Sequence, residues 1–392
     1  MAQQPRIAIV CDFLTVMGGA ESVVLAMHEA FPDAPIYTAI YNPSKLPAFD
    51  GLDVRTTWLQ KLPKKLRNSY KLFPTLAVKA FRDLDLSDYD IILTSSYLVA
   101  NQVRKTRDSQ RIVSYCHTPA RYYWSHYKEY RKRPGYGKLD PLVKLAIPFM
   151  VPRQRKLDYE AAQRVDTFIA NSSVTQQRIK QHYGKPSTVV HPPVETARFT
   201  PARTRRDYYV TLGRQLAYKR HDLAVAACTK LGIKLKVFGS GPEHERLKKL
   251  AGPTISFYTD RFDEASDEEV TRALAYARGF IFPAEEDFGI VSVEALASGA
   301  PVIGYARGGT TDIVTSQEVG VLFENQTVDD VVAAIRKAES LQWFPSKLQR
   351  TARRFDKVLF INKLRKIVAS SLPQPTPQRA QNTPGTAPKR GS

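Results

Sequence analysis

Short apolar runs alternate with longer amphipathic stretches along most of the chain, and the alternation predicts strands and helices in turn. In the first part, residues 7–11, 90–94 and 111–115 have the length and composition of buried strands. Residues 167–170 and 188–191 are two further strand candidates. Continuous apolar strands with helices between them are typical of a parallel sheet covered on both faces.

The same pattern starts again after a proline-containing break. Residues 192–206 hold three prolines and few apolar residues, which indicates a linker. Beyond it we expect five strands and four helices: strands at 208–213, 235–238, 254–258, 280–282 and 301–304, and helices at 221–231, 267–277, 291–298 and 328–340. The chain therefore reads as two doubly wound α/β units in series.

These patterns predict the domain organisation of the whole chain. Residues 1–191 form the N-terminal unit, 192–206 the linker and 207–355 the C-terminal unit. A last amphipathic helix at 356–371 is expected to complete the N-terminal unit. Residues 372–392 are rich in Pro, Gln, Thr and Gly and are expected to be a disordered tail.

Composition narrows the class of protein. Hydrophobic residues make up 43% and charged residues 24%, which is ordinary for a globular protein. The three cysteines form no CxxC pair, which argues against a zinc ribbon or a disulfide scaffold and favours a reducing compartment. The longest apolar stretch near the middle, 142–152, is shorter than the ~20 residues that a membrane span needs. We therefore expect a soluble protein, or one attached to a surface from outside.

The most informative segment is the loop and helix start at 283–295. Glu286 and Glu294 are eight residues apart, which is ~12 Å along a helix. That separation suits a sugar at one end of a diphosphate and a ribose at the other, because carboxylates accept hydrogen bonds from hydroxyls. The backbone N–H groups at a helix start attract phosphate. Alternatively, the carboxylates only complement the helix dipole.

Three other features lie at expected strand ends. Arg214, and Lys219 five residues later, are cations that suit a diphosphate, although in a basic protein they could simply be solvated. Gly18 and Gly19 would let the backbone approach a ligand, or form a plain tight turn. His117 follows the strand at 111–115, where a side chain faces the cleft between two such units.

Together these motifs resemble a retaining glycosyltransferase of family 4 with the GT-B fold. The resemblance rests on Gly-Arg with a downstream Lys, on Gly-x-Gly-Pro at Gly239 and Gly241, and on Glu-x7-Glu with Phe288-Gly289 inside it. It spans nearly the whole chain up to about residue 371. The stretches SYCHTPARYYW and FPAEEDFGIVSVEALASG are similar to the WbaZ-like branch, bacterial mannosyltransferases of surface polysaccharide synthesis.

The resemblance implies a role for each matching residue. His117 and Glu286 would act beside the transferred hexose, and Glu294 would bind the nucleoside ribose. Asp312 stands where the family often has Glu, and Arg220 where many relatives have Gly. The donor-binding residues would be Gly18, Gly19, Arg214, Lys219, Gly239, Gly241, Phe288, Gly289, Ile290 and Glu294.

Charge adds a prediction about partners. Of the formal net charge of +20, +15 lies in residues 60–82 and 121–156, where bases are mixed with apolar and aromatic side chains. Such stretches fit docking on an anionic membrane, although a solvated basic face is the alternative. The expected membrane or acceptor surface consists of Lys61, Lys64, Lys65, Arg67, Lys128, Arg131, Lys132 and Arg133.

We therefore predict a GT-B glycosyltransferase on the inner face of the plasma membrane. Its donor would be GDP-mannose or, alternatively, a UDP-sugar, and its acceptor a saccharide or a lipid-linked glycan. With Arg214 and Lys219 stabilising the leaving diphosphate, no metal or other cofactor is expected. The DxD-like pairs Asp83/Asp85 and Asp88/Asp90 lie at or before a strand start, so we interpret them as loop acids.

Three other classes are less well supported by the sequence. A nucleic-acid-binding protein would also be basic, but no RRM, KH or zinc motif is present. An NAD(P)-dependent enzyme would need a third glycine after Gly239 and Gly241. A non-catalytic homologue would not be expected to keep every site residue.

Overall fold

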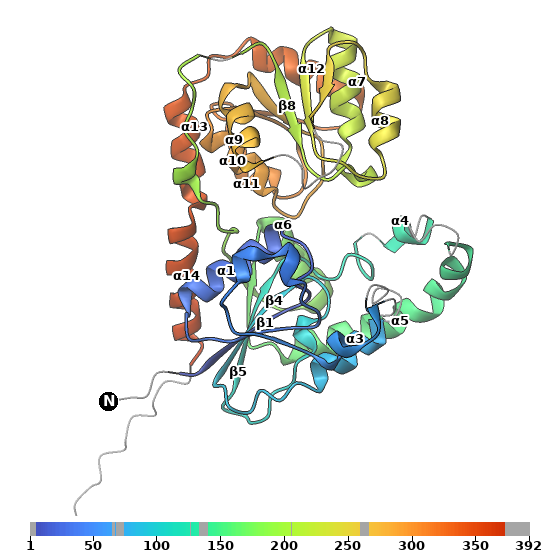
Figure 1. Ribbon diagram of the computed structural model, residues 1–392, viewed down its shortest axis with the longest axis vertical. Coiled ribbons are helices and arrows are strands. Elements are labelled where there is room, and N and C mark those ends of the chain that lie inside the picture. The colour runs from blue at the N-terminus through green and yellow to red at the C-terminus, as the bar shows by residue number, and fades with distance from the viewer. Residues whose placement is uncertain are drawn as a thin grey trace, which may run out of the picture.

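The computed structural model describes residues 5–64, 67, 74–125, 127–132, 140–204, 206–258 and 266–372, with the side chains of residues 128–130 left out. Within these ranges the chain forms two α/β domains, one above the other in Figure 1. Lys65, Arg133 and the predicted tail from residue 373 on lie outside the described residues, as does the side chain of Lys128.

The N-terminal domain is built on a seven-stranded parallel sheet in the order β3-β2-β1-β4-β5-β6-β7. The apolar runs form the strands because helices bury both faces of the sheet; all six residues of β4 are buried. The elements are β1 (Ile7–Cys11), α1 (Gly19–Ala30), β2 (Ile36–Thr38), β3 (Val54–Thr56), α3 (Pro74–Arg82), β4 (Ile91–Ser96), β5 (Arg111–Cys116), α4 (Tyr127–Lys132), α5 (Asp140–Arg164), β6 (Thr167–Ala170), α6 (Ser173–Tyr183) and β7 (Ser187–Val189).

The C-terminal domain repeats the plan with a six-stranded parallel sheet in the order β10-β9-β8-β11-β12-β13. Its elements are β8 (Tyr209–Leu212), α7 (His221–Leu231), β9 (Leu235–Phe238), α8 (His244–Leu250), β10 (Ile255–Phe257), α9 (Asp267–Tyr276), β11 (Gly279–Phe282), α10 (Ile290–Ala297), β12 (Val302–Tyr305), α11 (Thr310–Ile313), β13 (Gly320–Phe323), α12 (Val328–Glu339) and α13 (Pro345–Ala352). Each sheet has a hydrophobic cluster on either face.

The chain crosses between the domains twice, and the two crossings lie side by side. Val194 donates its N–H to the carbonyl of Phe355 at 3.0 Å, and its carbonyl accepts from Lys357 at 3.0 Å. After the second crossing, α14 (Lys357–Ser370) runs down the N-terminal domain beside α1 (Figure 1). Phe360 and Leu364 of α14 are buried in that domain's core, so the last helix belongs to the N-terminal domain.

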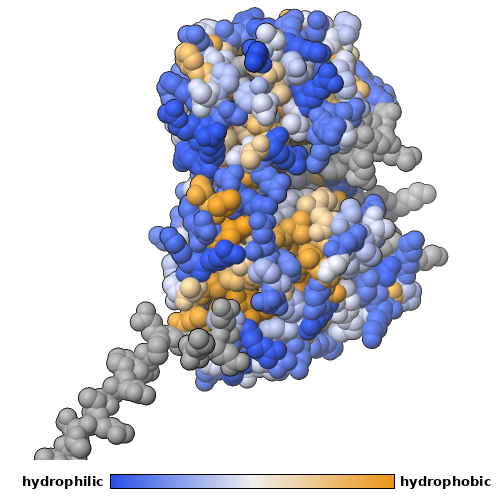
Figure 2. All heavy atoms as spheres, turned by 60° about the vertical axis from the view of Figure 1, so that its left-hand side comes forward, coloured by the Kyte–Doolittle hydropathy of each residue, from blue (hydrophilic) through white to orange (hydrophobic). Residues whose placement is uncertain are grey.

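Two surfaces of the N-terminal domain carry exposed apolar side chains. Helices α4 and α5 extend away from the sheet in Figure 1, and Leu142, Leu145 and Phe149 of α5 are 68%, 69% and 80% exposed. Figure 2 shows hydrophobic residues gathered where α14 crosses the domain, and Val358 and Leu359 are exposed there. Among the described residues, no helix is long and apolar enough to cross a membrane.

Candidate active site

The carboxyl ends of the two sheets face each other, and most of the predicted site residues lie on the loops that follow those ends. In the N-terminal domain β1 leads to Gly18 and Gly19, and β5 leads to His117. In the C-terminal domain β11 leads to the loop before α10. The two sides touch, since a Cβ added at Gly19 would lie only 2.9 Å from Cδ1 of Ile290. Ligands of doubly wound sheets bind at such edges.

Glu286 and Lys219 form an ion pair on the C-terminal side of the junction. Their side chains are only 18% and 17% exposed. Burial alone would lower the pKa of Lys219, but the carboxylate of Glu286 outweighs it and the pKa is raised. Lys219 is therefore a fixed cation, and its contact with Glu286 brings together two residues that the sequence placed 67 positions apart.

A pair of glycines supports the loop that carries Glu286. Gly308 has φ +73°, and a Cβ on it would overlap the carbonyl oxygen of Glu286. Gly309 donates its N–H to that same carbonyl at 2.9 Å. Only glycine allows this approach, so Gly308 and Gly309 set the position of the Glu286 backbone.

Arg214 is the cation of the site that has no carboxylate partner. It directly follows Gly213, whose φ is +140°, and its side chain is exposed. No ion pair joins it to any residue in the described part of the chain. An unpaired guanidinium has its fork of donors available for an anion, and phosphate is the anion that its geometry fits best.

Glu294 lies on α10, slightly more than one helix turn after its first residue, Ile290. Gly289 caps this helix with φ +94°, a conformation that favours glycine. The Glu294 side chain accepts no hydrogen bond from the residues that the structure describes, and burial raises its pKa, with Arg198 opposing. A partly buried carboxylate without a donor among the described residues has its oxygens available for ligand hydroxyls.

Three other predicted donor residues take part in packing. Phe288 is buried, with its ring 5.4 Å from that of His191 and 5.5 Å from that of Phe355. Gly239 and Gly241 lie against the backbone of Gly213 and Gln215, where added Cβ atoms would collide with main-chain carbonyls. These glycines therefore have a structural reason to be glycine, namely the close approach of the β8 and β9 loops.

His117 is held on the N-terminal side by β4 and β5. Its Nε2 lies 2.8 Å from Oγ of Ser95, and its ring packs edge-on against Tyr97 and Tyr115. Burial lowers its pKa to about 4, although Asp287 opposes the shift, so the imidazole is neutral at pH 7. A neutral, fixed imidazole can orient a hydroxyl; its role beside the substrate stays a prediction.

The buried carboxylate of Asp12, which sequence reasoning missed, shapes the wall next to His117. It accepts hydrogen bonds from four successive backbone N–H groups, those of residues 97–100, at 2.6 to 3.0 Å. Burial nevertheless raises its pKa to about 6. Nearby Glu21, at the start of α1, has its pKa raised to about 7, also by burial. Asp12 thus fixes the Tyr97 loop that packs on His117.

Asp287 joins the two domains, a contact that no pattern in the sequence predicts. Arg121 donates to one carboxylate oxygen of Asp287 and Arg178 to the other, both within 2.5 Å to 3.1 Å. The three side chains are 20%, 11% and 13% exposed for Arg121, Arg178 and Asp287. Arg178 also lies 3.4 Å from Glu285. Because Asp287 follows Glu286 directly, these ion pairs hold the loop that carries Glu286 against the N-terminal domain.

Asp312 makes a second contact between the domains. Its carboxylate accepts hydrogen bonds from the N–H and hydroxyl of Ser173 and lies 3.1 Å from Nε2 of His191. Burial alone would raise the pKa of Asp312, but these hydrogen bonds outweigh it and the pKa is lowered. At this position, where the family often has Glu, the shorter side chain of Asp312 contacts the first residue of α6.

The remaining predicted residues lie away from the junction. Lys61, Lys64, Arg131 and Lys132 are exposed, and Arg67 is partly buried with its guanidinium on the carbonyl of Gln60. Asp83 accepts from Lys79 and Trp58, and Asp85 from the N–H of Ser87. Both acids precede β4, at the amino edge of the sheet, and so lie far from the residues at its carboxyl edge.

Two family models match the chain, one on each domain. Residues 17–198 match the model described as Glycosyltransferase Family 4, and residues 195–355 match Glycosyl transferases group 1. The boundary between the two matches falls in the segment that links the domains.

Curated relatives match over parts of their length. The GDP-mannose-dependent alpha-(1-6)-phosphatidylinositol monomannoside mannosyltransferase of Mycobacterium tuberculosis is 28% identical over 214 residues, 47% of this chain and 56% of the relative. The sulfoquinovosyl transferase SQD2 of Arabidopsis thaliana is 23% identical and covers 81% of this chain and 60% of its own. The chain thus spans little more than half the length of these relatives.

Solved structures agree on the fold. Anabaena HepE in complex with UDP and glucose has a TM-score of 0.66 at 16% identity and covers 92% of this chain and 99% of its own. WaaG, a glycosyltransferase involved in lipopolysaccharide biosynthesis, has a TM-score of 0.59 at 15% identity, with 92% and 99% covered. Taken with the two family models and the two facing sheets, these likenesses show that the chain has the GT-B fold and belongs to glycosyltransferase family 4.

Proposed function

We propose that this protein is a retaining glycosyltransferase that moves a hexose from a nucleotide-diphosphate sugar to a saccharide or lipid-linked acceptor. The observation that carries the proposal is the ion pair of Lys219 and Glu286. Close to Lys219 in the sequence, Arg214 follows β8 and has no ion-pair partner among the described residues. Fixed cations favour the charge that develops on a leaving diphosphate. Glu286, held by Lys219 on one side, is placed to contact the sugar.

The ribose would bind at Glu294 and the diphosphate between Arg214 and the start of α10. Both assignments draw support from side chains that lack protein partners within the described residues. Neutral His117, on the opposite domain, would contact the sugar from the acceptor side. Retention of the anomeric configuration and the absence of a metal requirement are part of the proposal. Assay in excess EDTA tests the latter, since a metal-dependent enzyme would lose most turnover.

GDP-mannose is the first donor to test, because the mycobacterial relative is named for it. A UDP-sugar is the second, because HepE was solved with UDP and glucose. Calorimetry with GDP and UDP on the intact protein separates the two.

Arg214→Ala should weaken binding of the preferred nucleotide by ~1.5–3 kcal/mol, as for a lost charged hydrogen bond. The matched control, Arg203→Ala, removes an exposed linker arginine and should leave binding unchanged. If the intact protein binds neither nucleotide, the proposal is wrong.

We also propose that the N-terminal domain docks on the inner face of an anionic membrane, in keeping with a lipid-linked acceptor. The exposed cations Lys61, Lys64, Arg131 and Lys132 and the apolar stripe on α5 support this. Each Lys or Arg near such a surface contributes ~1 kcal/mol. Co-sedimentation with phosphatidylglycerol vesicles at low salt is the direct test, and a protein that stays in the supernatant would refute the membrane proposal.

A further inference from the structure

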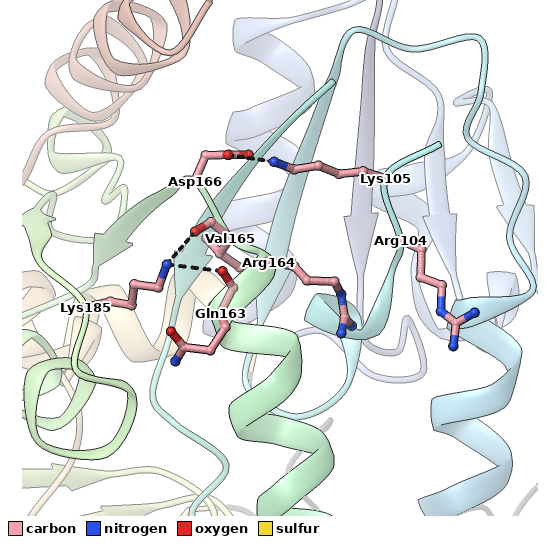
Figure 3. Close-up of a pocket in the computed structure, with 7 residues that line it drawn as sticks. All are labelled: Arg104, Lys105, Gln163, Arg164, Val165, Asp166 and Lys185. Atoms are coloured by element: carbon pink, nitrogen blue, oxygen red, sulfur yellow. Dashed lines mark hydrogen bonds and ion pairs between the residues drawn. The ribbon is translucent and has the colours of Figure 1, made fainter. Parts of the chain in front are cut away.

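A basic pocket opens at the edge of the N-terminal sheet opposite to the active site. It has a volume of about 580 Å³ and is lined by Arg104, Lys105, Gln163, Arg164, Val165, Asp166 and Lys185 (Figure 3). Asp166 directly precedes β6 and Lys185 precedes β7, so the pocket lies at the amino ends of these strands. The donor site lies at the carboxyl ends, which makes the two sites separate.

The cations of this pocket are held in place mainly by neutral groups. Arg164 donates to the carbonyls of Glu160 and Gln102, and Lys185 to those of Gln163 and Val165. Arg82, the last residue of α3, donates to the side-chain oxygen of Gln102. Carbonyl and amide oxygens orient a cation without cancelling its charge, so the positive potential persists.

The single lining carboxylate is already occupied. Asp166 accepts from Lys105 at 2.6 Å and from the backbone N–H of Ile112 at 2.8 Å. Figure 3 shows the Lys105–Asp166 pair on one side of the pocket and the guanidinium groups of Arg104 and Arg164 on the other. Arg104 is exposed and forms no ion pair within the described residues. Asp166 is therefore already paired with Lys105 and forms no ion pair with either arginine.

Two further observations indicate that this charge is unsatisfied. Nε of Arg164 is buried and, among the described residues, has no hydrogen-bond acceptor. Burial lowers the pKa of Arg164, and Arg82 and Arg104 add to the shift while Glu160 opposes it. Like charges brought together at a partly buried site cost stability unless an anion offsets them.

We propose that this pocket is a second anion site, which binds a phosphate group between the guanidinium groups of Arg104 and Arg164. Phosphate fits because its oxygens accept paired N–H donors from arginine, and because the pocket has more room than a halide would need. The phosphate could belong to a phospholipid headgroup or to a soluble phosphorylated compound. The inference is independent of the donor site, which lies at the other edge of the sheet.

Hydrogen exchange of the full chain with inorganic phosphate tests the site directly. Phosphate should slow exchange at least threefold in residues 102–106 and 163–167. The double variant Arg104→Gln/Arg164→Gln should lose most of this protection. Any residual protection should require a phosphate concentration at least tenfold higher than in the intact protein. The control Lys249→Gln/Arg350→Gln removes the same charge from exposed positions of the C-terminal domain and should behave as the intact protein. Arg104→Glu, at an exposed side chain, gives a second variant with little risk to folding.

Vesicles distinguish the two sources of phosphate. If the ligand is a headgroup, the double variant should co-sediment with phosphatidylglycerol vesicles at least fivefold less than the control variant does. If it loses phosphate protection but still binds vesicles like the control, the site takes a soluble phosphorylated compound. If phosphate protects neither segment of the intact protein, or protects the double variant equally, the proposal is overturned. Binding of GDP or UDP is measured in parallel, so that failure of the donor site is seen separately.

Discussion

At the scale of single residues, burial decides the protonation of several groups around the junction. His221, at the start of α7, lies with Nδ1 3.0 Å from the hydroxyl of Thr211. Burial lowers its pKa to about 3, and Lys219 adds to the shift. In the unfolded chain the imidazole takes up a proton near pH 6.5, whereas in the folded protein it is still neutral at that pH.

His221 should make stability fall as the pH falls. Between pH 7.5 and 5 the unfolded state takes up a proton at this residue and the folded state does not, so folding loses ~2 kcal/mol. The stability difference between the intact protein and His221→Gln should shrink by that amount, measured by urea unfolding at both pH values. Buried carboxyls such as Asp12, whose pKa is raised, act in the opposite direction, but they contribute equally to both proteins.

Cys228→Ala, in the same helix, is the control for this measurement. Cys228 is fully buried and burial raises its thiol pKa to about 12, so its substitution should cost the same at both pH values. A constant difference between intact protein and His221→Gln would mean that His221 takes up its proton at the same pH in the folded and the unfolded protein, which contradicts the lowered pKa.

Glycine should be required at position 308 for two reasons: the backbone there has a positive φ, and an added Cβ would displace the backbone of Glu286. Gly308→Ala and Gly184→Ala both force a non-glycine residue into the left-handed region, at φ +73° and +67°, which costs ~1–2 kcal/mol each. At Gly184 an added Cβ meets nothing within 4 Å, whereas at Gly308 it overlaps the Glu286 carbonyl. Gly308→Ala should therefore be the less stable variant and should lose transfer activity, while Gly184→Ala keeps it. Equal activity in both would show that the Glu286 loop tolerates the shift.

At the scale of elements, continuous apolar runs predicted most of the strands of both sheets. The strands at 167–170 and 235–238 and the helix at 221–231 match the structure in both bounds. Strands β2, β3 and β13 were not predicted. β2 and β3 are three residues long, and the outer strand β3 leaves Arg55 and Thr56 exposed. Such short segments carry too little period-two pattern to stand out from loops.

The candidate site was predictable as far as it depends on strand ends. Lys219 and Glu286 were both identified from their local motifs, and the structure adds that they touch. Arg178 was not identified because it lies in the middle of α6, where a lone arginine looks like any solvated helix residue. Its contact with Asp287 depends on how two domains are placed, and local patterns carry no information about that.

Helix α5 should provide the part of membrane binding that salt does not remove. Leu142, Leu145 and Phe149 follow helical spacing and are highly exposed. Replacing all three by Ser should abolish the binding to phosphatidylglycerol vesicles that persists at high salt, because apolar contacts are not screened. The control replaces the exposed Phe344, Val358 and Leu359 by Ser, on the other side of the molecule. If both triple variants bind alike, α5 does not enter the bilayer.

At the scale of the whole molecule, the two domains are joined by two adjacent crossings and by ion pairs across the junction. The crossings at Val194 and at 355–357 are hydrogen-bonded to each other. Asp287 and Asp312, both from the C-terminal domain, contact α6 or the loop after β5. The contacts between the domains therefore include Asp287, which belongs to the same loop as Glu286.

Asp287→Asn should open the molecule and impair catalysis together. It removes the shared partner of Arg121 and Arg178, and breaking a buried ion pair costs up to ~3–5 kcal/mol, less here because the side chains keep some exposure. The radius of gyration from small-angle X-ray scattering should increase, and kcat/KM should fall at least about tenfold, which corresponds to about 1.4 kcal/mol. Asp207→Asn, which breaks the exposed pair with Arg278, should change neither quantity. A compact Asp287→Asn protein with normal kcat/KM would show that these ion pairs are not what holds the domains closed.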